Sequence, residues 1–133
     1  MAAGLPDETV RRLREAARNA SANAYAPYSE FRVGAACLTA GGRIFSGVNV
    51  ENASYGLTVC AERNAVFQAV AAGERDIQAV LVYTPTSEPT TPCGACRQVL
   101  SEFGDDIAVL CHCDGDVVLE VSVAELLPHG FRL

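Results

Sequence analysis

Cys60-Ala61-Glu62-Arg63 is the stretch on which the interpretation of this sequence depends, together with Pro92-Cys93-Gly94-Ala95-Cys96 about thirty residues later. Each stretch is followed by residues that favour a helix. The first predicted helix follows Cys60 and is closed by Gly73, and the second follows Pro92 and is closed by Gly104. The pattern therefore predicts two helices that each carry cysteine at the N-terminus.

The cysteines of the two stretches form a candidate zinc site. A helix N-terminus stabilises thiolate relative to thiol, which favours metal binding by Cys60 and Cys93. Cys96 follows Cys93 by three residues, so the two sulfurs share one helical face. Three thiolates on a tetrahedral zinc leave the fourth position open for water, which is typical of a catalytic zinc. Glu62 is placed to exchange protons with that water without being a ligand.

Each half of this pattern has a simpler explanation when it is taken alone. A lone C-x-x-C is typical of a redox dithiol or of half a structural zinc site. A lone Cys-x-Glu at the start of a helix carries no information. Their combination, with Pro92 before Cys93, matches the zinc deaminases, in which the glutamate acts as general acid and base. Deamination is therefore the favoured reaction.

Length and composition limit the class of protein. The chain has 133 residues, 50% of them hydrophobic and 20% charged, which predicts a single globular domain over residues 1–133. The net charge is −6 and no basic run is present, so a small-molecule substrate is favoured over nucleic acid. No apolar signal segment or membrane-spanning run is found, which predicts a cytoplasmic protein without a membrane partner. The six cysteines are then expected to be reduced thiols.

Hydrophobic periodicity predicts an α/β domain. An amphipathic helix is expected over residues 7–24, capped by Asp7 or Thr9, with the arginines at positions 11, 12, 14 and 18 on its solvated face. Strands are expected over residues 31–40, 43–50, 77–83, 107–113 and 117–123, followed by a short helical turn. The linker over residues 84–92, rich in proline and threonine, is interpreted as a loop without function. This order indicates a sheet of about five strands with helices on both faces.

Two polar features have alternative interpretations. The run over residues 49–56 can be a solvated turn, but Asn49 and Glu51, two apart in extended chain, would point the same way and can bind a sugar diol. Cys111 and Cys113 share one face of a predicted strand, with His112 on the other. A second metal site is conceivable there, but strand packing is favoured.

Four segments resemble the small homotetrameric, zinc-dependent cytidine deaminases: FRVGAA at 31–36, GVNVENASYGLTVCAER at 47–63, PCGACRQVL at 92–100 and LLPHGF at 126–131. The resemblance extends from Tyr25 to Phe131. It implies a three-layer αβα sandwich with a mixed sheet, one Zn²⁺ per subunit, and a homotetramer with shared active sites. The implied reaction is the hydrolytic deamination of cytidine and 2′-deoxycytidine to uridine and 2′-deoxyuridine plus ammonia, in pyrimidine salvage.

The resemblance also implies roles for individual residues. Cys60, Cys93 and Cys96 would be the zinc ligands, and Glu62 the catalytic proton shuttle. The substrate-binding residues would be Phe31, Asn49, Glu51, Tyr55, Ala61 and Phe131. Of these, Asn49 and Glu51 would bind the ribose hydroxyls. Phe131 would stack on the base and Tyr55 lie near the sugar, in pockets that neighbouring subunits complete.

Arg63 has a role that is expected from charge. Three thiolates on Zn²⁺ leave a single net negative charge, which opposes the ionisation of water, and two helix N-termini offset this with roughly one positive charge in total. Arg63 adds another positive charge if it folds back to the sulfurs. The alternative is a solvated helix residue.

Three other functions are alternatives to cytidine deamination. A deaminase of another cytosine nucleoside, such as blasticidin S, shares the zinc motifs, although Glu51 favours a substrate with ordinary ribose hydroxyls. A structural zinc or redox module would make Glu62 incidental. Editing of RNA or DNA is disfavoured by the acidic net charge.

Overall fold

A mixed β-sheet forms the centre of the computed structural model, which describes residues 4–133. Its strands are β1 (Gly34–Thr39), β2 (Ile44–Val48), β3 (Ile77–Tyr83), β4 (Ala108–His112) and β5 (Leu119–Ser122), in the spatial order β2-β1-β3-β4-β5. The helices are α1 (Asp7–Ser21), α2 (Ala61–Ala71), α3 (Gly94–Phe103) and α4 (Val123–Leu126), with a 3₁₀ turn, η1 (Tyr55–Leu57).

Strand direction determines where loops can gather. β1 pairs antiparallel with both β2 and β3, and β4 pairs antiparallel with β5. β3 and β4 run parallel, with Leu81 opposite Leu110, because α3 provides the crossover between them. The carboxyl ends of β3 and β4 therefore lie side by side at one end of the strands, a common location for ligands in α/β folds.

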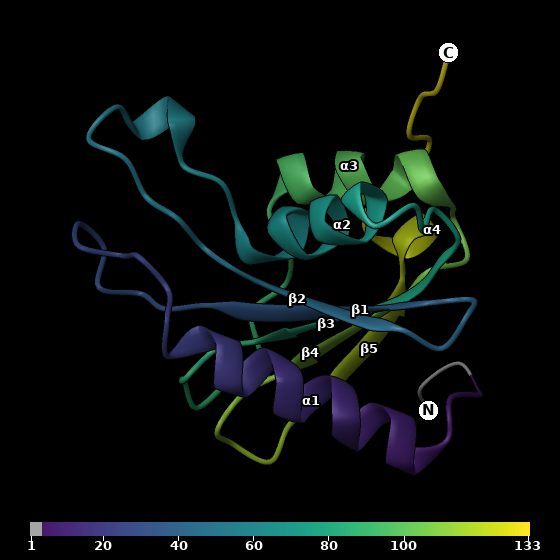
Figure 1. Cartoon of the computed structure of the whole chain (residues 1–133), viewed down its shortest axis with the longest axis horizontal. Helices are drawn as coiled ribbons and strands as arrows, with labels where there is room; N and C mark the ends of the chain where they lie inside the picture. The colour runs from purple at the N-terminus through teal and green to yellow at the C-terminus, as the bar shows by residue number, and fades with distance from the viewer. Residues whose placement is uncertain (1–3) are drawn as a thin grey trace.

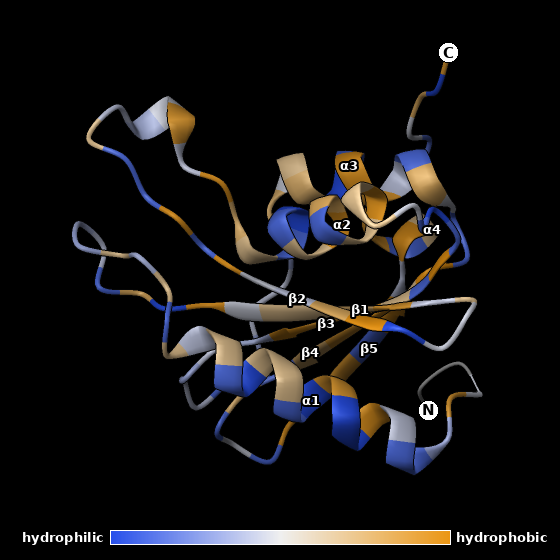
Figure 2. Ribbon diagram, viewed as in Figure 1, coloured by the Kyte–Doolittle hydropathy of each residue, from blue (hydrophilic) through white to orange (hydrophobic). Residues whose placement is uncertain are grey.

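Helices cover both faces of the sheet, as Figure 1 shows: α1 lies on one face, and α2, α3 and α4 lie on the other. Alternate strand residues pack on the two sides. Leu13 and Leu81 belong to the core beside α1, whereas Val66, Val80 and Leu100 belong to the core beside α2 and α3. The middle of the sheet is mostly orange in Figure 2, as expected for strands that are buried on both faces.

The expected three-layer αβα sandwich with a mixed sheet of about five strands is confirmed. β3 coincides with the strand predicted over residues 77–83, and α2 and α3 directly follow Cys60 and Cys93. α1 ends at Ser21, three residues before the predicted end. The predicted caps Asp7 and Thr9 are wrong, because Pro6, with extended backbone (φ −61°, ψ 148°), occupies the N-cap position.

In the described residues, no helix has both the length and the apolar character needed to cross a bilayer.

Arg14 contradicts the expectation that all four arginines of α1 are solvated. Its Nη1 lies 3.1 Å from His112 Nδ1, its Nη2 donates to the Cys113 carbonyl at 3.0 Å, and the guanidinium lies 5.5 Å from the centre of the Tyr83 ring. Arg14 is half-buried because the ends of β3 and β4 lie against α1 at this point. Within residues 4–133, neither His112 nor its two cysteine neighbours belong to a possible metal-binding group, which favours packing as their role.

Two glycines let helices approach the sheet closely. A β-carbon at Gly47 of β2 would lie 2.4 Å from the backbone nitrogen of Ala65 in α2. A β-carbon at Gly34 of β1 would lie 1.9 Å from the carbonyl oxygen of Ala17 in α1. No side chain fits at either point, so these two positions set the depth at which α1 and α2 pack on the sheet.

Candidate metal centre and active site

Three cysteine sulfurs meet where α2 and α3 begin. Cys60 Sγ lies 3.5 Å from Cys93 Sγ, which lies 3.6 Å from Cys96 Sγ, and all three atoms are within 4.8 Å of one another. Ligands about 2.3 Å from a tetrahedral zinc are about 3.8 Å apart, so the sulfurs have nearly the spacing that zinc requires. No other group of three such side chains in residues 4–133 is arranged to hold a metal ion.

Two helix N-termini place these sulfurs. Cys60 is the N-cap residue of α2 and Cys93 that of α3, each with extended backbone and without a side-chain capping hydrogen bond. Cys96 lies in the first turn of α3 and is buried. The N-terminal ends of both helices therefore lie beside the sulfurs, where the helix dipoles stabilise negative charge.

The Cys60 thiol ionises more readily than the Cys96 thiol. Hydrogen bonds from Cys96, Arg63 and Cys93 lower the pKa of the Cys60 thiol to about 5. The pKa of the Cys96 thiol is raised above its ordinary value, chiefly by its hydrogen bond with Cys60. Arg63 Nη2 donates to Cys60 Sγ at 3.5 Å, so the arginine side chain folds back to the sulfurs.

Glu62 lies in a small cavity beside the cysteine cluster. The residue is 4% exposed, and burial, with a smaller contribution from negative charge on Cys60, raises the pKa of its carboxyl to about 7. The cavity has a volume of about 180 Å³, and Cys60 and Cys93 form part of its wall. A carboxyl with a pKa near 7 can both accept and release a proton at neutral pH.

Three of the expected substrate residues, Phe31, Asn49 and Ala61, line the same cavity. Asn49 is buried, its Oδ1 accepts a hydrogen bond from the Val33 backbone N–H at 2.9 Å, and its Nδ2 donates to the Phe31 carbonyl at 2.8 Å. The Asn49 amide therefore holds residues 31–33 against the cavity, and Phe31 forms part of its wall.

Glu51 lies outside this cavity. Its carboxylate accepts hydrogen bonds from the backbone N–H groups of Tyr28 at 2.9 Å and Ser29 at 3.1 Å, and from the Ser29 hydroxyl. The hydroxyl is the main reason why the pKa of the Glu51 carboxyl is below its ordinary value. Glu51 and Tyr55 line a second hollow of about 400 Å³, which shares Thr58 with the Glu62 cavity.

Val50, between Asn49 and Glu51, forms bridges to both Tyr25 and Val59, so the chain stays extended beyond β2. The expected common direction of Asn49 and Glu51 stays a prediction. The two residues line neighbouring hollows that share Thr58, and their side chains bind different segments of the chain.

The other two expected substrate residues are exposed. Tyr55 in η1 is 77% exposed, and Phe131 in the C-terminal tail is 69% exposed and does not line the cavity of its own chain. In Figure 1 the segment around η1 and the C-terminal tail both project from the body of the molecule.

Threonines that the sequence did not indicate form much of the cavity wall. They are Thr58, Thr84, Thr90 and Thr91. Three of the four belong to the linker over residues 84–92, which the sequence had presented as a loop without function. The available signal was its position after β3, since loops at the carboxyl ends of parallel strands commonly contact ligands.

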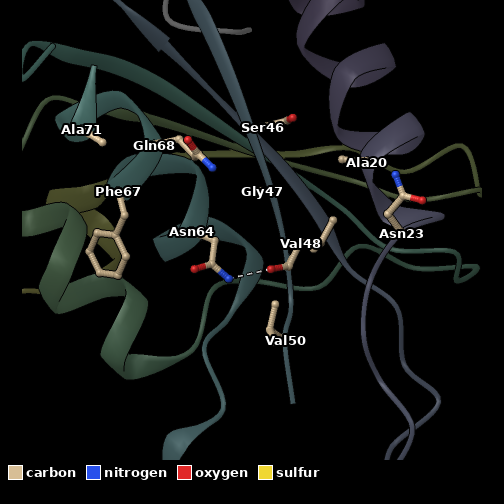
Figure 3. A pocket seen from close by; sticks show the side chains of 10 residues that line it. All are labelled: Ala20, Asn23, Ser46, Gly47, Val48, Val50, Asn64, Phe67, Gln68 and Ala71. Carbon is tan, nitrogen blue, oxygen red and sulfur yellow. Dashed lines mark hydrogen bonds between the residues drawn. The ribbon is translucent and has the colours of Figure 1, made fainter. Parts of the chain in front are cut away.

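A larger hollow of about 610 Å³ lies along β2, the edge strand, between α1 and α2 (Figure 3). Asn64 Nδ2 donates to the Val48 carbonyl at 2.7 Å, which satisfies part of the exposed strand edge. The Phe67 ring lies at its rim in Figure 3. Among the described residues that line this groove none is titratable, so it offers no acid–base or metal chemistry.

Comparison with known proteins agrees with the geometry of the cysteine cluster. Residues 7–112 match the family model of the cytidine and deoxycytidylate deaminase zinc-binding region. The chain belongs to the cytidine and deoxycytidylate deaminase family. Zinc is therefore the metal of this centre, and Cys60, Cys93 and Cys96 are the group that can hold it.

Relatives of this deaminase cover most of its length. The cytidine deaminase of Halalkalibacterium halodurans is 51% identical over 110 residues, which are 81% of this chain and 83% of that protein. The crystal structure of the cytidine deaminase from Burkholderia pseudomallei superposes with a TM-score of 0.87 at 49% identity, covering 91% of this chain and 98% of that one. The blasticidin-S deaminase of Bacillus cereus is more distant, at 34% identity over 108 residues, 75% of this chain and 76% of that protein.

Proposed function

We propose that this deaminase hydrolyses cytidine and 2′-deoxycytidine to uridine and 2′-deoxyuridine with release of ammonia. The observation that carries the proposal is the cavity in which the buried Glu62 lies beside the Cys60, Cys93 and Cys96 sulfurs. Its volume of about 180 Å³ is below the roughly 300–1,000 Å³ of pockets for larger ligands. This size favours a cavity that takes the pyrimidine ring of the nucleoside and leaves the sugar outside. The names of relatives at 51% and 49% identity support the same substrate.

The residues of the cavity divide the chemistry between metal and carboxyl. Zinc bound by the three thiolates supplies the Lewis acidity that makes water nucleophilic near neutral pH. Glu62 takes one proton from the attacking water and delivers it to N3 of cytosine as the C4–O bond forms. The same carboxyl carries the second proton to the exocyclic amine, and ammonia leaves as the C4–N bond breaks.

The remaining site residues are assigned to substrate binding. Phe31 and Ala61 would form walls for the base, and Asn49, which lines the same cavity, would bind the ribose hydroxyls together with Glu51. Glu51 lines the adjoining hollow, where its carboxylate can accept hydrogen bonds from ribose hydroxyls. An acceptor at this position favours a nucleoside with an ordinary ribose over blasticidin S.

We also propose that four copies of the chain assemble and share their sites, each copy acting as one domain. Tyr55 and Phe131 are large side chains that project into solvent, and Phe67 on α2 is exposed as well. Exposed aromatic side chains near a site are typical of surfaces that another subunit covers. In the tetramer, Phe131 of a neighbouring subunit would stack on the base and Tyr55 would lie near the sugar. A role in pyrimidine salvage and a location in the cytoplasm are part of the same proposal.

Metal analysis combined with an absorbance assay tests the proposed reaction. The purified protein should contain one zinc per chain and should convert cytidine with loss of the cytosine absorbance. Glu62→Ala should keep zinc and lose about 10²–10⁴-fold in turnover, because proton transfer is removed. Glu102→Ala, at an exposed glutamate of α3, is the matched control and should retain full turnover.

Two results would replace the proposal. Zinc without any turnover of cytidine or deoxycytidine would favour the structural-zinc alternative. Turnover of blasticidin S in preference to cytidine would keep the chemistry and change the substrate.

A further inference from the structure

Arg97 contacts three parts of the site through one side chain. Its Nε donates to the Pro92 carbonyl at 2.8 Å, its Nη2 to the Thr91 hydroxyl oxygen at 3.1 Å, and its Nη1 to the Leu126 carbonyl at 3.0 Å. Its backbone N–H donates to the Cys93 carbonyl at 3.0 Å. Arg97 therefore contacts Thr91 in the cavity wall and Leu126 at the end of α4. It also contacts Pro92 and the zinc ligand Cys93, which follow Thr91 in the chain.

The planar guanidinium is required for this set of contacts. Its N–H donors point in fixed, divergent directions, whereas a lysine ammonium is a single point that cannot reach three separated oxygens. Within residues 4–133, Arg97 forms no ion pair with a carboxylate. Three neutral oxygens, rather than an opposite charge, therefore fix the position of the Arg97 side chain.

The contact with α4 extends the connection to the C-terminal tail. Leu126 is the last residue of α4, and the tail beyond it is hydrogen-bonded to α3 at two points. Gln98 Nε2 donates to the Phe131 carbonyl at 3.3 Å, and Arg132 Nε donates to the Ser101 carbonyl at 2.8 Å. The surface of α3 beside its cysteines thus carries the tail, and Arg97 joins that surface to the cavity wall.

We propose that Arg97 is a positioning residue of the deaminase site. By holding Thr91, the peptide bond between Pro92 and Cys93, and the end of α4 in one arrangement, it sets the cavity wall and the Cys93 sulfur relative to Glu62. Arg97 does not line the cavity and acts through Thr91 and Cys93. The turnover part of its test rests on the proposed function, and the zinc part does not.

Arg97→Lys tests the proposal because it keeps the positive charge and removes the divergent N–H donors of the guanidinium. Zinc affinity of the full-length protein is measured by competition with a chromophoric chelator, and it should fall about 10- to 100-fold, as when a residue that orients a metal ligand is removed. At saturating zinc, KM for cytidine should rise by a larger factor than kcat falls, because the cavity wall is disturbed and Glu62 is not. Arg132→Gln releases the tail from Ser101 and serves as the control, since its zinc affinity should equal that of the parent.

The outcomes separate the two proposals. A folded Arg97→Lys protein with parental zinc affinity and parental KM would overturn the positioning role and leave the deaminase function intact. A parent that binds zinc without turning over cytidine would overturn the function, and a loss of zinc affinity in Arg97→Lys would still support the positioning role.

If Arg97→Lys does not fold, Thr91→Val decides. It removes the acceptor of Nη2 and should lower zinc affinity, whereas a loss of substrate contact alone would raise KM and leave zinc affinity unchanged, which overturns the proposal.

Discussion

Arg63 brings positive charge to a cluster that must accumulate negative charge. Its Nη2 lies 3.5 Å from Cys60 Sγ, a charge-assisted contact that stabilises the thiolate over the thiol. The N-termini of α2 and α3 act in the same direction, but each contributes only about half an elementary charge. Three thiolates on a divalent ion are thus balanced by two helices and one arginine.

Arg63→Gln should therefore lower zinc affinity by about 10- to 100-fold. It should also move the acid limb of the kcat–pH profile to higher pH, because less positive charge remains to favour ionisation of water. Both quantities are measured on zinc-loaded protein, with Arg75→Gln, an exposed arginine after α2, as the matched control. Identical profiles for Arg63→Gln and the parent would show that the helix dipoles suffice.

Glu51 has two possible duties, because the carboxylate proposed to bind ribose also binds its own chain at Tyr28 and Ser29. Glu51→Ala should raise KM for cytidine about 10- to 100-fold, the loss expected when a charged acceptor is removed from two hydroxyls. Ser29→Ala removes the hydroxyl partner of Glu51 and leaves the carboxylate free for the sugar. Steady-state kinetics of both variants decide: equal increases in KM would mean that Glu51 acts by holding the loop.

At the scale of elements, the contact of α2 with β2 controls where the first turn of α2 lies. Gly47→Ala would bring a methyl group to 2.7 Å from the Ala61 carbonyl oxygen and still closer to the Ala65 nitrogen. Backbone atoms cannot move aside, so the helix must shift. We expect a loss of about 1–3 kcal/mol in the free energy of unfolding, measured by urea denaturation. Gly41→Ala, in the turn between β1 and β2, meets only a side-chain oxygen at 3.6 Å and should be neutral; equal stabilities for the two variants would refute the close contact.

Helices and strands could be predicted from the sequence where neighbouring residues alone determine them. The apolar run of β3, and the glycines at 73 and 104 that close α2 and α3, depend on neighbouring residues alone. The zinc cluster was also accessible, because Cys60 and Cys93 mark the starts of two helices. The hydrogen bonds of Asn49 to residues 31–33 and of Glu51 to residues 28–29 were not, since they join segments that are distant in the chain. The three contacts of Arg97 likewise exist only in the folded chain.

At the scale of the whole molecule, the cavity of one chain lacks a second aromatic wall. Phe31 lines it, whereas Phe131 lies exposed in the tail. Shared sites in a tetramer would explain both facts, since the exposed ring would enter the cavity of another copy.

Co-expression of two inactive variants tests this sharing. Glu62→Ala and Phe131→Ala are each expected to be impaired, the first in proton transfer and the second in binding the base. In mixed assemblies, about one site in four combines an intact Glu62 with an intact Phe131 from another copy, by random assortment. Turnover well above that of either variant alone is expected. No recovery, in assemblies shown by mass spectrometry to be mixed, would place Phe131 outside the shared site.

Cys60 precedes β3 in the chain and Cys93 follows it, so an ion bound to both sulfurs closes a loop of 33 residues around the central strand. A covalent cross-link across such a loop lowers the conformational entropy of the unfolded chain by an amount worth about 3–4 kcal/mol. A metal cross-link has the same effect for as long as its ligands stay bound. Binding at both sulfurs therefore stabilises the folded chain, in which β3, inside this loop, pairs with β1 and β4, outside it. Metal release and global unfolding are thereby coupled, and the resistance of the protein to heat becomes a property of its zinc occupancy.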